Sequence, residues 1–240
     1  MNIAHIVPVK QMYLIEDQPI AMFLTHLVEN YPEYEHFAKN FKGYKILDNS
    51  LIEVGKAMSI GRVVDAACRI HADEIILPDV FRSSGPTLHA VESALNTLET
   101  MGMSQAFYTM AVAQGHNAET FKQCYEALEK INEIDVIGIP KITAKLHPKG
   151  RPYFEPLWFN SCKSIHLLGL WYSFIELSAY RALNRIRSVD TCLASFFTQH
   201  GLEPASAVRP DGFTIDLENT IIDDGGFEVW KSYCDRFVRN

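Results

Sequence analysis

The chain has 240 residues, a hydrophobic fraction of 48% and a formal net charge of −7. This composition supports one domain with a full hydrophobic core and excludes a disordered chain, and the longest apolar stretches fall short of the ~18 residues of a membrane span. The negative charge argues against non-specific binding of nucleic acid, although a local basic patch would be compatible with it. The first residues lack the pattern of a secretory signal, so we expect a soluble protein of the cytoplasm with no membrane partner.

Short apolar runs alternate along the chain with longer segments of helical period. Each run is nearly continuous and does not alternate with polar residues, which is typical of parallel strands that are buried on both faces. The runs that predict strands cover residues 3–8, 44–49, 74–79, 107–115, 135–140, 164–170 and 188–192, with a weaker eighth at 212–217.

Apolar residues recur with helical spacing between these runs, and we predict helices over residues 60–71, 86–101 and 118–131. Strands and helices that alternate in this way are typical of repeated βα units. The sequence therefore predicts an α/β fold, a (β/α)8 TIM-type barrel forming a single domain over residues 1–240, with an open doubly wound sheet as the alternative. Segment 144–157 is rich in proline and lysine, and we expect a long loop inside the domain.

Polar residues and glycine follow the apolar runs at the points where the predicted strands end. The chemistry of an α/β barrel takes place at this end of its strands. A single Asp after a strand commonly caps a helix or forms a turn, but several charged groups around one barrel mouth are costly to bury without a use or a partner. We therefore expect one shared site. Its residues are Asp48, Asn49, Asp79, Gln114, Gly169 and Asp190.

Several familiar site motifs do not occur in the sequence. There is no glycine-rich phosphate loop after a strand, no GxSxG around a serine, and no HExxH pair. The five cysteines are scattered and never form a CxxC pair, which argues against a zinc-thiolate site and a disulfide framework. We expect neither a metal ion nor an organic cofactor.

The segments at the predicted strand ends resemble those of the tRNA-guanine transglycosylase family. One strand of that family ends in Asp-Ser-Gly-Gly-aromatic-Gln, and the segment YKILDNSLIEVG places Asp48 at the Asp and Glu53 at the Gln. The next strand of the family ends in an Asp that reads the base, which EIILPDVF matches with Asp79. The V-Q-G-G segment of the family is matched by VAQGHN with Gln114.

The resemblance continues in the last two predicted strands, so that five matches in order cover residues 44–201. The Y-L-M-G of the family is matched by HLLG with Gly169, and its G-I-D-x-F-D-C-V by IRSVDTCL, where Asp190 takes the place of the nucleophile. Gly201, eleven residues further on, also falls in place.

The chain also departs from the pattern of the family. Residues 49–51 replace the Gly-Gly of the first motif, and Ile139-Pro140-Lys141 replaces a Gly-Gly-Leu loop that holds the base. The CxCxxC zinc site is absent, and we see no additional C-terminal RNA-binding domain. The sequence is therefore most similar to the compact, phage-type branch that inserts 7-deazaguanines into DNA.

The resemblance implies a pentosyltransferase that exchanges guanine for a 7-deazaguanine in DNA through a covalent aspartyl-glycosyl intermediate. It implies Asp190 as the nucleophile and Asp48 as the general acid and base. Asp79, Gln114, Gly169 and Asn49 would bind the base. If the protein is encoded by a phage, it would act in the cytoplasm of the host, and a homodimer is left open.

Such an enzyme needs positive charge near the barrel mouth, with DNA favoured over tRNA as the partner. We expect a loop after the fifth run, with Lys141, Lys145, Lys149 and Arg151 beside aromatic residues, to contact nucleic acid. We predict a second basic cluster, with Arg181, Arg185 and Arg187, on a helix before Asp190. The alternative interpretation is that both are solvated surfaces.

Three other functions remain open at this point. The first is the same base exchange on tRNA. The second is a non-catalytic, nucleic-acid-binding subunit of such an enzyme, although the presence of both Asp48 and Asp190 argues against it. The third is an unrelated barrel that acts on sugars through two carboxylates.

Overall fold

A computed structural model shows the chain as a barrel of parallel strands, and it describes residues 1–170, 174–180, 185–202 and 215–238. Eight strands form one sheet in the order β1-β8-β7-β6-β5-β4-β3-β2, in which all seven ladders are parallel. This order confirms the (β/α)8 TIM-type barrel and rules out the doubly wound sheet. The strands are β1 (Asn2–His5), β2 (Ile20–Leu24), β3 (Tyr44–Asp48), β4 (Glu74–Ile76), β5 (Tyr108–Val112), β6 (Val136–Pro140), β7 (Ser164–Leu168) and β8 (Ile186–Thr191).

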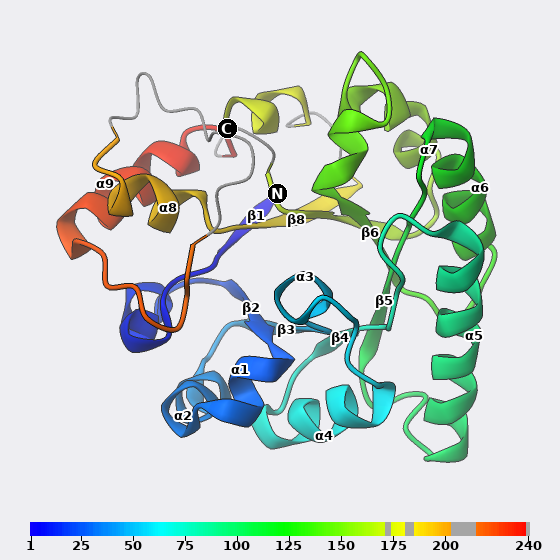
Figure 1. Cartoon of the computed structure of the whole chain (residues 1–240), viewed down its shortest axis with the longest axis horizontal. Coiled ribbons are helices and arrows are strands. Elements are labelled where there is room, and N and C mark those ends of the chain that lie inside the picture. The colour runs from blue at the N-terminus through cyan, green and yellow to red at the C-terminus, as the bar shows by residue number, and fades with distance from the viewer. Residues whose placement is uncertain (171–173, 181–184, 203–214, 239–240) are drawn as a thin grey trace.

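Helices surround the barrel, and α3 (Leu51–Val54) alone is drawn inside the ring of strands in Figure 1. The others are α1 (Thr25–Asn30), α2 (Pro32–Asn40), α4 (Ile60–Ile70), α5 (Ser84–Thr100), α6 (Ala118–Leu128), α7 (Glu155–Phe159), α8 (Leu193–Gln199) and α9 (Asp224–Asp235). The predicted helices at 60–71, 86–101 and 118–131 correspond to α4, α5 and α6. None of the helices in the described ranges is long and apolar enough to cross a membrane.

The hydrophobic core has two layers because successive residues of a strand point to opposite faces. Alternate residues of the strands fill the barrel lumen, where Met22, Ile46 and Met110 pack together. The residues between them, such as Phe23 and Leu47, pack outward against the helices. Both faces are therefore buried, which explains why the strands read as continuous apolar runs.

The eighth strand does not lie where the sequence predicts it. The additional strand of the barrel is β2, which was not predicted and pairs with β3 from Ile20↔Tyr44 to Leu24↔Asp48. Its residues IAMFL also suit a helix, so their strand conformation is decided by pairing with β3 and not by local preference. Residues 212–214 of the predicted strand at 212–217 lie outside the described part of the chain, and 215–217 are not a strand.

Two further segments also differ from the prediction. The segment 144–157 is not one long loop, because it contains parts of three short helices: 3₁₀ helices η2 (Lys141–Lys145) and η3 (Arg151–Phe154), and α7. Arg187 lies in strand β8 and not on a helix before Asp190. The ladder between β7 and β8 shifts register, since Ile165 pairs with Ile186 and His166 with Ser188, so that Arg187 is bulged.

Candidate active site in the barrel mouth

The carboxyl ends of the strands surround a cavity of about 790 Å³. All six residues that the sequence singles out at strand ends line this cavity, although they come from segments spread over more than half of the chain. They are Asp48, Asn49, Asp79, Gln114, Gly169 and Asp190. Parallel strands bring them together because all carboxyl ends lie on one side of a barrel.

Asp190 is held at the end of β8 by two hydrogen bonds to the same oxygen. The backbone N–H of Gly169 donates to Asp190 Oδ1 at 3.0 Å, and His166 Nε2 lies 3.1 Å from that oxygen. Gly169 has a φ of +67°, which favours glycine, and this conformation aims its N–H at Asp190. Asp190 Oδ2 accepts no hydrogen bond from the described residues, so the two oxygens of this carboxylate differ in their surroundings.

Asp48 ends β3 at the same cavity, and its carboxyl group has a different environment. Burial, together with the negative charge of nearby Glu53, raises the pKa of Asp48 well above its ordinary value. Asp79 and Asp190 add smaller repulsions in the same direction, while a hydrogen bond of 2.8 Å from the Ser50 N–H to Asp48 Oδ2 opposes them. Asp48 is thus a carboxyl group of the cavity that favours its protonated form.

Asp79 is buried and lies between two side-chain amides. Asn49 Nδ2 donates to Asp79 Oδ1 at 2.8 Å, and Gln114 Nε2 donates to Asp79 Oδ2 at 2.7 Å. The amide oxygens accept the backbone N–H groups of Leu51 and Arg82, which orients both NH2 groups toward Asp79. Burial raises the pKa of Asp79 to about 6 although both amides favour the carboxylate.

A left-handed turn places the helix α3 over the cavity. Ser50 has a φ of 59°, a conformation that favours glycine. Its hydroxyl oxygen lies 2.9 Å from His26 Nδ1, which fixes the turn to the start of α1. Four consecutive residues of α3 then line the cavity, among them Glu53.

The six predicted basic residues that the structure describes do not share one surface. Lys141 lines the cavity, and Lys145 and Lys149 are exposed on the segment that follows it. Arg151 is only 1% exposed, because its guanidinium donates to the Gly169 carbonyl at 2.9 Å and pairs with Glu176 at 3.2 Å. Arg151 therefore lies inside the fold and not on the surface of this segment.

The second predicted basic cluster does not lie on a helix in the described part of the chain, and Arg181 lies outside the described residues. Arg185 precedes β8 and Arg187 lies near its beginning, so both are at the amino end of the strands, opposite the cavity. Arg187 also donates to both oxygens of Glu74 at the start of β4. Nucleic acid that enters the cavity would approach the other end of the barrel.

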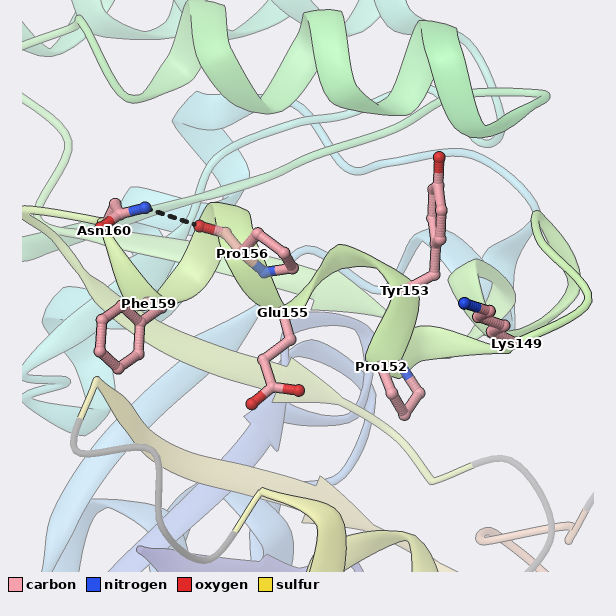
Figure 2. A pocket seen from close by; sticks show the side chains of 7 residues that line it. All are labelled: Lys149, Pro152, Tyr153, Glu155, Pro156, Phe159 and Asn160. Atoms are coloured by element: carbon pink, nitrogen blue, oxygen red, sulfur yellow. Dashed lines mark hydrogen bonds between the residues drawn. The ribbon is translucent and has the colours of Figure 1, made fainter.

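Lys149 borders a second pocket, of about 590 Å³, whose residues belong to the segment after β6 (Figure 2). Pro152, Glu155 and Phe159 project to one side of this segment, and Tyr153 projects to the other side. Phe159 is 70% exposed, whereas the aromatic residues Phe154 and Trp158 are buried. None of the residues that line this pocket lines the cavity in the barrel mouth.

The cavity also contains charged residues that the sequence analysis does not assign to a site. Glu218 and Asp216 line it from a segment before α9, and His26 lines it from α1. Burial lowers the pKa of His26, although Glu218 and Glu29 oppose this. His26 follows a strand that was not predicted, and Asp216 and Glu218 lie at no strand end, so no pattern in the sequence marks them.

The lining of the cavity is strongly acidic, because it contains six acidic side chains and one lysine among the described residues. The acidic side chains are Asp48, Glu53, Asp79, Asp190, Asp216 and Glu218. Such a lining suits a group that donates hydrogen bonds and repels phosphates from the interior. No group of three or more His, Cys, Asp or Glu side chains in the described part of the chain is arranged to hold a metal ion.

The fold and the cavity define a (β/α)8 barrel with a carboxylate-rich cavity at the carboxyl ends of its strands. The sequence matches no model of a known protein family. It also has no significant match among curated proteins.

Proposed function

We propose that this protein is a pentosyltransferase that exchanges guanine for a 7-deazaguanine in DNA. The observation that carries the proposal is that Asp48 and Asp190 line one cavity together with an Asp79 that two amides orient. The resemblance to the tRNA-guanine transglycosylase family assigns roles to these same residues. The left-handed Ser50 also supports it, because this turn lies where the family has glycines.

The reaction would begin with attack of Asp190 Oδ2 on C1′ of the deoxyguanosine sugar. The bond between C1′ and N9 breaks, its electron pair goes to N9, and Asp48 donates a proton to the departing guanine. The raised pKa of Asp48 suits this role, because a general acid must be protonated at the working pH. Asp48 then removes a proton from the incoming base, which attacks C1′ and releases the Asp190 carboxylate.

Asp79 would recognise the edge of the base. The N1–H and the exocyclic amino group of guanine are donors, and Asp79 offers two acceptor oxygens that Asn49 and Gln114 hold in place. A site that pairs a polar edge rejects bases that lack it, because its own buried groups would be left unpaired. The nucleotide must leave the duplex to reach such a pocket, and a cavity of about 790 Å³ accommodates a flipped base.

A second candidate function is hydrolysis of a glycoside by the same two carboxylates. The acidic lining favours this second function in one respect, because six acidic side chains against one lysine hinder the entry of a phosphate backbone. In the base-exchange proposal only the base and sugar enter, and the phosphates stay at the rim near Lys141 and Lys145.

The test is release of labelled guanine from DNA and from tRNA, with and without added 7-deazaguanine. Wild type should release guanine and incorporate the new base, and should form a protein–DNA adduct that survives denaturation. Asp190→Asn should abolish both signals, with a loss of at least about 10⁴-fold in rate. Asp65→Asn is the matched control, because its carboxylate lies on the surface of α4 and is 70% exposed.

The possible outcomes separate the alternatives. Release from tRNA alone would keep the chemistry and overturn the DNA assignment. Release without incorporation would favour hydrolysis. No release from either substrate, together with binding of DNA that Asp190→Asn retains, would replace the proposal with a non-catalytic binding protein.

A further inference from the structure

Polar side chains form a continuous hydrogen-bonded path through the lumen of the barrel, from its amino end to Asp190. Most of the lumen is apolar, so a polar path through it is costly unless every member is paired. In order along the path the residues are Glu74, Arg187, Ser188, His166 and Asp190. Arg187 reaches this path because the bulge in β8 redirects its side chain into the lumen, where it also lies over the ring of Tyr44.

The path has a direction that follows from what each group can donate. The guanidinium of Arg187 only donates, so the Ser188 hydroxyl oxygen accepts from Arg187 Nε at 3.3 Å. Ser188 then has its own hydroxyl proton for His166 Nδ1, which lies 2.8 Å away. If Nδ1 accepts, the ring proton is on Nε2, which faces Asp190 Oδ1 at 3.1 Å.

This direction determines which oxygen of Asp190 can react. His166 Nε2 and the Gly169 N–H both bind Oδ1, and they fix the rotation of the carboxylate. Oδ2 then remains as the oxygen without a donor from the described residues. His166 is fully buried and does not line the cavity, so it acts only through Asp190.

We propose that His166 is a positioning residue for Asp190: a neutral imidazole with its proton on Nε2, held in this tautomer by Ser188 and Arg187, which presents Asp190 Oδ2 to the sugar. This inference rests on the proposed function for the role of Asp190. The tautomer itself does not depend on that function and is measured separately.

The first measurement is ¹⁵N NMR of the full chain labelled at histidine, with the His166 signals assigned by their loss in His166→Gln. We expect the neutral ring to have an unprotonated Nδ1 and a protonated Nε2. Ser188→Ala should remove this preference. A proton on Nδ1, either in the other tautomer or in an imidazolium, would overturn the inference whether or not the protein exchanges bases.

The second measurement is base exchange on DNA by variants at the path. His166→Leu should lower kcat by about 10- to 100-fold with little change in KM, because a lost hydrogen bond to a charged group typically has this effect on a reacting carboxylate. His166→Gln should recover part of kcat, since its amide N–H can donate to Asp190. Ser188→Ala, which removes only one hydroxyl group, should lower kcat less.

His5→Leu is the matched control. His5 is equally buried at the end of β1, yet neither of its ring nitrogens has a hydrogen-bond partner among the described residues. It should leave kcat unchanged. If the wild type exchanges bases and both His166→Leu and Ser188→Ala keep its full kcat, this inference is overturned and the proposed function stands. Absence of exchange in the wild type would overturn the proposed function, and the NMR result would still decide the tautomer.

Discussion

Arg187 on β8 donates to both carboxylate oxygens of Glu74 on β4, at 2.7 and 2.9 Å, across the lumen of the barrel. The two strands lie on opposite sides of the barrel, separated by β5, β6 and β7 on one side. The pair therefore ties two distant parts of the sheet together at the end opposite the cavity. Glu74 is completely buried, and Tyr44 also donates to it at 2.8 Å.

Removal of Glu74 should destabilise the fold. Glu74→Gln leaves the partly buried Arg187 without its counter-ion, and loss of one partner of a buried pair costs about 3 kcal/mol. Urea denaturation measures the change in the free energy of unfolding. Glu29→Gln is the control, because Glu29 pairs with Arg62, whose side chain is 59% exposed, and such surface pairs contribute about 0–1 kcal/mol. Equal effects of the two substitutions would show that the lumen pair does not stabilise the barrel.

Asp79 should make the stability of the protein depend on pH. Its pKa in the folded state is about 6, above the ordinary value of 3.8, so the folded state binds the proton more tightly than the unfolded state. The favourable contribution of Asp79 to the free energy of unfolding is complete below about pH 4. It is lost as the pH rises through 6, a change of about 2–3 kcal/mol. Urea denaturation at several pH values should show this loss in the wild type but not in Asp79→Asn. The same slope in both proteins would contradict the prediction.

The pH dependence of guanine release should report Asp48. Its raised pKa keeps it protonated, so single-turnover release should fall as the pH rises through that pKa, and Asp48→Asn should be about 10²- to 10⁴-fold slower. Glu53 raises the pKa of Asp48 by charge repulsion. Glu53→Gln should therefore move the loss of activity to lower pH. If the loss of activity moved to higher pH, or did not move, Glu53 would not be raising the pKa of Asp48.

Gly169→Ala should impair activity more than it impairs stability. An added Cβ would meet the side chain of Lys141 at 3.2 Å, and the φ of +67° disfavours a side chain, at a cost of about 1–2 kcal/mol. The peptide group of residue 169 should therefore shift, and the hydrogen bond from its N–H to Asp190 should weaken. Gly102→Ala is the control, because its φ is +68° and nothing lies within 4 Å of the added Cβ. Thermal denaturation and base exchange of both variants test this, and equal loss of exchange would contradict it.

Lys145 and Lys149 should account for part of any affinity for nucleic acid. Each alanine substitution should reduce the slope of log K against log salt by about 1, if the lysine contacts a phosphate. Arg185→Ala is the control, because Arg185 is exposed at the amino end of β8, away from the cavity. Titrations with single-stranded DNA at several salt concentrations measure the slope. If Arg185→Ala reduced the slope more than the two lysine substitutions, the nucleic acid would bind at the other end of the barrel.

The sequence by itself determined the barrel and the strand-end residues of the cavity. Continuous apolar runs of strand length, each followed by a helical period, have few alternatives to parallel βα units. Once that fold is accepted, Asp48, Asp79, Gln114 and Asp190 must meet, because parallel strands bring their carboxyl ends to one side.

Only the tertiary structure decided the rest. The run IAMFL became β2 because it pairs with β3, and Arg187 turned into the lumen because β8 contains a bulge. Arg151 resembles a surface residue in sequence, but its partners Gly169 and Glu176 come from other segments and bury it. His166 gained its connection to Asp190 only through neighbouring strands. Such features depend on contacts between distant parts of the chain, which local composition and periodicity do not encode.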